Sequence, residues 1–229
     1  MIPVAADDFV RTAREQTGPV WDAIHAHPFV RGIGDGTLSR ARWAFYLRED
    51  HAYLSDLCRL LGLAAARARD PEDMRFFSRL LATTLDVEIE LHLRACAALG
   101  IDRAELENPN PSLVTTGYAS YLLRTAYEGN SADVIAGLLP CYAGYVEIAG
   151  RLRDAGLPEE PRCREWIETY VSAGMRDIAA WLARRMDDHA RAGTPADQAR
   201  WLTQYSTSAR FELLFFETCW SLNDDRGRE

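Results

Sequence analysis

The sequence predicts an all-α protein. Apolar residues recur at helical spacing in six or seven long segments, and glycine and proline fall between these segments rather than inside alternating strand-like runs. The connections are short, and the chain has no long linker, internal repeat or low-complexity tract. We therefore expect one domain over residues 1–229, built as an antiparallel bundle of about seven long helices.

The first four expected helices lie at residues 6–25, 39–69, 71–99 and 111–128. The second is rich in leucine and alanine. The third begins at Pro71, because a helix tolerates a missing N–H in its first turn, and Asp70 can cap it. The 100–110 connection ends in an Asn-Pro-Asn-Pro run, which disfavours helical backbone and separates the third helix from the fourth.

The last three expected helices lie at residues 132–155, 161–191 and 195–222. A Gly-Asn-Ser turn precedes the first of them, where Ser131 can cap, and Gly156 stops it. The other two begin at Pro161 and Pro195, and Thr194 can cap the final helix.

Composition excludes several classes of protein. No apolar stretch approaches the roughly 18 to 20 residues that cross a bilayer, and the first residues lack the basic and apolar pattern of a secretory signal. The five cysteines form no CxxC pair, which favours reduced thiols over a zinc or redox site. A cytoplasmic protein without a membrane partner is therefore expected.

The charged residues exclude further classes of ligand and chemistry. The formal net charge of −8, with arginines spread among acids, disfavours nucleic-acid binding. All 26 basic residues are arginine, so Schiff-base, pyridoxal-phosphate and Walker A chemistry, which need lysine, are excluded. Small molecules or protein partners remain as ligands.

The segment 27–38 holds three glycines between two predicted helices, so a phosphate-binding loop has to be considered. No strand precedes it, and it contains neither GxGxxG nor GKS. Glycines that supply positive φ in a helix-to-helix turn explain it more simply.

Two polar constellations could bind or transform a ligand. Asp50 and Tyr53 share a helix face, where a carboxylate beside a phenol can hold a flat heterocycle; a surface Asp beside a core Tyr is the alternative. Cys141 follows Pro140, which is expected to kink its helix, with Tyr145 one turn later, although a lone helical cysteine is usually inert.

Glu212 lies in an almost wholly apolar run on the last helix. A buried carboxyl group there can exchange protons near neutral pH, whereas a solvent-facing Glu would have no such role.

A metal site is the competing hypothesis, because acids and a histidine crowd one helix: Asp86, Glu88, Glu90 and His92. The Glu-x-x-His pattern of ferritin-like sites is absent, and no second helix carries a matching pair. We expect no metal and no other cofactor. Four further histidines are expected at helix ends or on the surface: His25, His27, His51 and His189.

Taken together, these segments resemble the TenA or thiaminase II family over roughly residues 7 to 223. The resemblance rests on the order and spacing of several pieces: His-Pro-Phe-Val at 27–30, Gly-Asp-Gly-Thr-Leu at 34–38, Phe-Tyr at 45–46 with Asp50 and Tyr53, Leu-Pro-Cys-Tyr at 139–142, and Glu212. It implies a heme-oxygenase-like helical fold without bound haem, and a homotetramer.

The resemblance also implies roles for individual residues. Cys141 is expected to be the nucleophile, Glu212 the acid/base, and Asp50 the group that grips the ring nitrogen and amino group of an aminopyrimidine. Pocket residues are expected at Tyr53, Tyr118, Tyr145, Tyr170 and Phe215. Addition of the thiolate to the ring would expel the group on the exocyclic methylene, and water would replace it with hydroxyl.

The chain departs from the family pattern at several places. Ala143 and Gly144 stand where many members have Trp soon after the cysteine, which predicts a wider pocket, and Arg210-Phe211 and Phe216 replace Tyr-Tyr and Trp. These changes affect the expected substrate preference. The alternatives are a non-catalytic pyrimidine- or partner-binding module and a di-iron oxidase.

Overall fold

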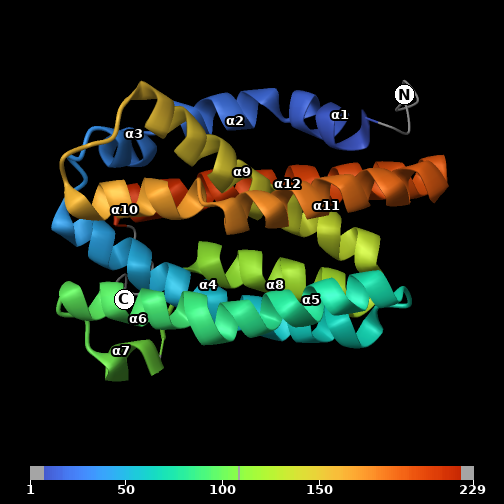
Figure 1. Ribbon diagram of the computed structural model, residues 1–229, viewed down its shortest axis with the longest axis horizontal. Helices are drawn as coiled ribbons and strands as arrows, with labels where there is room; N and C mark the ends of the chain where they lie inside the picture. The colour runs from blue at the N-terminus through green and yellow to red at the C-terminus, as the bar shows by residue number, and fades with distance from the viewer. Residues whose placement is uncertain (1–7, 108, 223–229) are drawn as a thin grey trace. The chain divides into compact units, whose positions relative to one another are not determined.

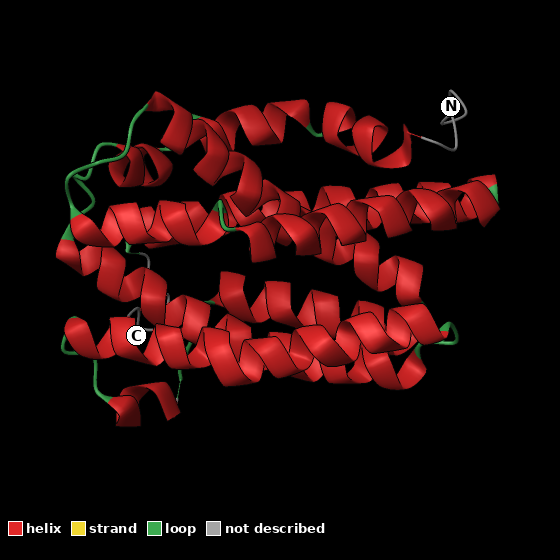
Figure 2. Cartoon of the chain, viewed as in Figure 1, coloured by secondary structure: helices red, strands yellow, loops and turns green. Residues whose placement is uncertain are grey.

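The computed structural model describes residues 8–107 and 109–222. Every regular element in this range is helical, and the connections are short loops (Figure 2). The chain divides into two compact units, Met1–Leu38 with Ile135–Glu217, and Ser39–Val134 with Thr218–Glu229, called here unit 1 and unit 2. The prediction of an all-α protein is confirmed.

Unit 2 is built around the long helix α4 (Arg40–Arg67), capped by the Ser39 hydroxyl. Helices α5 (Pro71–Thr83), α6 (Ile89–Ala98) and α8 (Leu113–Glu128) contact α4 and run beside it (Figure 1). A π-helical turn, η2 (Thr84–Glu88), joins α5 to α6, and the short α7 (Arg103–Glu107) follows. Apolar side chains such as Leu60, Leu61 and Phe77 fill the core.

Unit 1 combines three N-terminal helices with the C-terminal ones. The first are α1 (Phe9–Gln16), α2 (Gly18–His25) and α3 (Pro28–Gly34); the others are α9 (Ser131–Ala155), α10 (Pro161–Tyr170), α11 (Ala173–Ala192) and α12 (Pro195–Ser221). Residues 131–134 of α9 and 218–221 of α12 belong to unit 2. Helix α1 contacts α11, and α10 contacts α3. Helix α12 meets α1 through Trp201 and Phe9, and meets α3 through Phe216 and Phe29.

The seven predicted segments are present, but three of them are interrupted. The first breaks at Thr17, before Gly18 and Pro19, and its predicted start lies outside the described residues. The sixth breaks after Tyr170, where Ser172 caps α11 by accepting from the Met175 N–H. The third contains the π-helical turn.

The expectation of glycines with positive φ in a helix-to-helix turn at 27–38 holds for Gly36 and not for Gly32 and Gly34, because residues 28–34 form α3. His27 caps this helix through Nδ1, which accepts from the Phe29 N–H. Within the segment, positive φ occurs at Gly36 and not at the other two glycines. Helix α7 likewise interrupts the 100–110 connection, and Asn130 rather than Ser131 caps α9 by accepting from the Ala132 N–H.

Helix α9 is long and apolar enough to cross a membrane by length and composition, yet 78% of its most apolar window is buried within the protein. That burial is typical of the core helix of a soluble protein. Pro140 lies inside this helix, so the carbonyl four residues before it loses its helical donor.

Candidate functional site

The predicted site residues fall into two groups, one in each unit. Unit 1 holds Cys141 and Tyr145 on α9, Tyr170 at the end of α10, and Glu212 and Phe215 on α12. Unit 2 holds Asp50 and Tyr53 on α4 and Tyr118 on α8.

Cys141 marks a change in burial along α9. Residues 132–140 are all buried, whereas Cys141 is half-buried. A nucleophilic thiol needs access for a ligand, and a half-buried position allows it. Cys141 is therefore placed differently from Cys96, Cys163 and Cys219, which are buried.

Aromatic rings gather one turn after Cys141. The centroid of the Tyr145 ring lies 4.9 Å from that of Tyr170 and 5.7 Å from that of Phe216, which it stacks upon. Phe215 contacts Phe216 edge to face, with centroids 6.2 Å apart. Tyr145, Tyr170 and Phe215 thus belong to one aromatic group, and flat apolar walls of this kind suit a flat ring.

Trp166 also belongs to this aromatic group, and sequence reasoning missed it. Its ring centroid lies 4.6 Å from that of Tyr170 and 5.8 Å from that of Tyr145. The available signal was the four-residue spacing of Trp166 and Tyr170, which places both on one helix face.

Glu212 is buried in unit 1, with 3% of its surface exposed. The solvent-facing alternative for this residue was therefore wrong. A carboxyl group in such a place needs hydrogen-bond partners or a bound proton, and either condition suits a group that exchanges protons during a reaction.

The expectation of extra space at Gly144 was also wrong. A Cβ atom on Gly144 would meet Cη2 of the Trp21 ring at 2.2 Å, so the indole of α2 already fills this position. Trp21 is 1% exposed. A Trp from another helix therefore occupies the room that Gly144 leaves.

In unit 2, Tyr53 and Tyr118 face each other, with ring centroids 5.3 Å apart and planes inclined by 30°. Both are buried. Asp50 lies one turn before Tyr53, its side chain is 17% exposed, and burial raises the pKa of its carboxyl group to about 7. Asp50 is therefore no surface residue.

Glu49, beside Asp50, positions α8 on α4. Its carboxylate accepts hydrogen bonds from the Ser112 N–H, the Ser112 hydroxyl and the Thr115 hydroxyl, the last at 2.5 Å. These bonds hold the first turn of α8, which precedes Tyr118, against α4. Sequence reasoning missed Glu49, because its partners lie more than 60 residues away.

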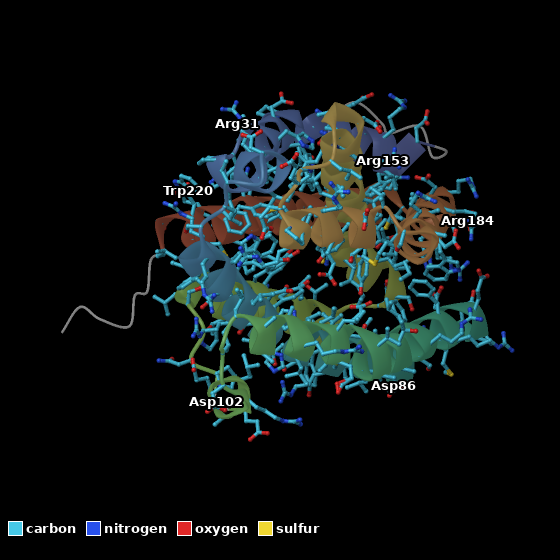
Figure 3. The ribbon with its side chains drawn as sticks, turned by 60° about the vertical axis from the view of Figure 1, so that its left-hand side comes forward. Arg31, Asp86, Asp102, Arg153, Arg184 and Trp220 are labelled. Carbon is cyan, nitrogen blue, oxygen red and sulfur yellow. The ribbon has the colours of Figure 1, made fainter. Side chains whose placement is uncertain are left out.

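The metal hypothesis finds no support in the described part of the chain, where no three His, Cys, Asp or Glu side chains are grouped to hold a metal ion. Asp86 is exposed and lies at the outer surface of η2 (Figure 3). Nε2 of His92 instead lies 2.7 Å from the carbonyl oxygen of Leu47.

Of the four remaining histidines, His27 and His51 are buried. The expectation of a surface or helix-end position was wrong for His51, which lies inside α4. His25 and His27 are at helix ends as expected, and each lies beside a glutamate: Nε2 of His25 is 3.0 Å from Glu147, and Nε2 of His27 is 3.1 Å from Glu217.

Comparison with known proteins agrees with these observations. The chain is 36% identical over 214 residues to an aminopyrimidine aminohydrolase of Halalkalibacterium halodurans, a match that covers 93% of this chain and 96% of the relative. A solved TenA homologue from P. horikoshii superposes with a TM-score of 0.86 at 28% identity, covering 94% of this chain and 99% of the homologue.

A domain from Shewanella denitrificans with a heme oxygenase-like fold superposes with a TM-score of 0.73 at 16% identity, over 93% of this chain and 92% of that domain. This likeness confirms the heme-oxygenase-like fold. The family model described as TENA/THI-4/PQQC matches residues 14–221. The chain therefore belongs to the TENA/THI-4/PQQC family.

Proposed function

We propose that this protein is an aminopyrimidine aminohydrolase that acts in thiamine salvage. Its substrate would be 4-amino-5-aminomethyl-2-methylpyrimidine, converted to 4-amino-5-hydroxymethyl-2-methylpyrimidine, with slower cleavage of thiamine. The observation that carries this proposal is the near full-length similarity to a relative that bears this activity in its name. The half-buried Cys141 and the buried Glu212 support it.

In the proposed mechanism the Cys141 thiolate adds to a ring carbon of the protonated aminopyrimidine, and the amine on the exocyclic methylene leaves with a proton from Glu212. Water then adds at the methylene, its proton goes to Glu212, and the thiolate is expelled. The buried position of Glu212 suits this two-way transfer.

Recognition of the ring is assigned to the aromatic and acidic residues. Asp50 would hydrogen-bond the ring nitrogen and amino group of the pyrimidine. Tyr53 and Tyr118, in the same unit as Asp50, would provide further contacts to the ring. Tyr145, Tyr170 and Phe215 would provide walls, with Phe215 stacking on the pyrimidine. The ring contacts within each unit support these assignments.

We further propose a single functional domain over residues 1–229, a cytoplasmic location and a homotetramer, with neither nucleic acid nor membrane as a partner. The net charge of −8 supports the exclusion of nucleic acid, since a negative protein repels a phosphate backbone. The reduced state expected for the five cysteines agrees with the cytoplasm.

The test follows formation of the hydroxymethylpyrimidine by chromatography, with the aminomethylpyrimidine and thiamine as separate substrates. Cys141→Ala is expected to lower turnover by roughly a thousandfold or more, because it removes the nucleophile. Cys58→Ala is the matched control, since Cys58 is also a half-buried helical cysteine. Near-normal turnover by Cys141→Ala would contradict the mechanism, and tight binding without conversion by the wild type would favour a binding module.

A further inference from the structure

The helix that follows the π-helical turn buries a histidine and leaves a leucine exposed. The buried stripe of α5 includes Phe77 and Leu80, and it continues through Thr84. In an uninterrupted α-helix this stripe would continue through Val87 and Leu91, at 3.6 residues per turn. Both are about half exposed, at 49% and 48%.

The stripe instead continues through Glu88, His92 and Cys96. His92 and Cys96 are buried, and Glu88 is half-buried. The wide π turn at Thr84–Glu88 accounts for this shift, because it adds one residue and rotates the following helix by about 100°. His92 is thereby turned toward α4 in place of Leu91, and π turns of this kind are frequent at functional sites.

His92 contacts α4 with both ring nitrogens. Its Nε2 lies 2.7 Å from the Leu47 carbonyl oxygen, and its Nδ1 lies 3.5 Å from Oδ2 of Asp50. A carbonyl oxygen can only accept, so Nε2 must carry a hydrogen. In the neutral ring Nδ1 is then an acceptor, and it faces a carboxyl oxygen.

Two acceptors face each other favourably only when a proton lies between them. A shared proton would therefore stabilise the Asp50–His92 contact, either on a carboxyl group that faces Nδ1 or on an imidazolium that faces a carboxylate. Burial raises the pKa of Asp50 to about 7 and lowers the pKa of His92, although the Leu47 carbonyl opposes the latter shift. Both directions favour the neutral pair.

We propose that His92 is a positioning residue for Asp50: anchored to Leu47, it orients the Asp50 carboxyl group, so that Asp50 meets the pyrimidine in one defined orientation. The role of Asp50 toward the ring rests on the proposed function. His92 itself need not touch the ligand.

Other titratable groups interact with Asp50 and belong to the same environment: Glu88 and Cys96 from η2 and α6, and Cys219 from the end of α12. Burial, and then the charge of Asp50, raises the pKa of Glu88 to about 7. His51, whose ring centroid is 5.6 Å from that of His92, has a pKa lowered by burial and by His92. Ionisation of Glu88 would therefore strengthen retention of the proton by Asp50.

Two substitutions separate positioning from mere packing. His92→Gln can still donate to Leu47, because its amide reaches the Nε2 position, but it leaves Asp50 without a partner. His92→Asn places an amide near the Nδ1 position, beside Asp50, and loses the Leu47 bond. A positioning role predicts that Asn retains more affinity for the hydroxymethylpyrimidine than Gln, whereas a packing role predicts the reverse.

Binding of that product is measured by calorimetry, so the test does not depend on turnover. His92→Gln is expected to weaken binding on the order of tenfold, and to have almost no further effect in an Asp50→Asn background, because contacting residues are energetically coupled. His51→Gln is the matched control and is expected to keep most of the affinity. Additive losses from His92→Gln and Asp50→Asn would overturn the proposal.

A second readout requires no ligand. Side-chain nitrogen NMR of His92, assigned by its loss in His92→Gln, is expected to show a protonated Nε2 and an Nδ1 signal that changes in Asp50→Asn. An Nδ1-protonated neutral ring, or an Nδ1 signal indifferent to Asp50→Asn, would contradict the pairing. Wild-type protein that shows this pairing but converts no aminopyrimidine would contradict the proposed function alone.

Discussion

At the scale of single residues, the protein places ionisable groups where burial changes their proton affinity. Asp50 and Glu88 have pKa values raised to about 7, in each case chiefly by burial. Such carboxyl groups cost stability when they ionise, and they are retained where a reaction or a ligand requires them. This cost is measurable in the pH dependence of folding.

The ordinary pKa of the Asp50 carboxyl group is 3.8, and in the folded protein it is about 7. Between these pH values the folded state binds more protons than the unfolded state, so the free energy of unfolding falls as the pH rises through this window. Asp50→Asn cannot ionise. We expect it to match the wild type near pH 4 and to be more stable by about 1–3 kcal/mol at pH 8.

Urea unfolding of both proteins at pH 4, 6 and 8 measures this difference. Glu88→Gln serves as a second variant, because it should remove its own share of the same pH dependence. Equal losses of stability in the wild type and Asp50→Asn would show that Asp50 ionises freely in the folded protein.

At the scale of helices, close packing at Gly144 determines how closely α2 approaches α9. The Trp21 ring lies where the side chain of residue 144 would be, so the two helices approach closely. Interiors packed in this way tolerate added volume poorly. The same contact supports the region of α9 that carries Cys141 and Tyr145.

Gly144→Ala is therefore expected to lower the free energy of unfolding by about 1–3 kcal/mol, because its Cβ would overlap the Trp21 ring. Gly150→Ala on the same helix is the control. A Cβ there meets nothing within 4 Å, so the change is expected to be neutral or to stabilise by up to about 1 kcal/mol. Thermal unfolding compares the two, and equal midpoints would mean that Trp21 moves aside without cost.

At the scale of the whole molecule, the chain carries a formal net charge of −8 and leaves several apolar side chains exposed. Exposed apolar side chains include Leu85, Val87 and Leu91 on η2 and α6, in unit 2. Burial of such residues between subunits is a common source of association between helical proteins.

The proposed homotetramer makes a direct prediction about mass. Light scattering after size exclusion is expected to give about four times the 25.8 kDa of one chain, without dependence on salt if apolar burial dominates the contact. Val87→Glu should lower that mass if this face lies in a subunit contact. A mass of one chain at all concentrations would contradict the tetramer.

The sequence by itself determined the class of fold, most helix starts and the family. Pro71, Pro161 and Pro195 lie in first turns as predicted, and Asp70 caps α5, because these preferences depend on neighbouring residues alone. The types of residue proposed to react were also visible, since Cys141 follows a proline within a helix and Glu212 interrupts an apolar run.

Only the tertiary structure decided which polar groups are buried and which partners they have. Sequence periodicity would bury Val87 and Leu91, yet the π turn buries His92 and brings it to Asp50, 42 positions earlier in the chain. In the same way, Trp21 fills the space at Gly144, and Glu49 finds its partners on α8. These contacts arise from packing between distant segments, which local preferences do not encode.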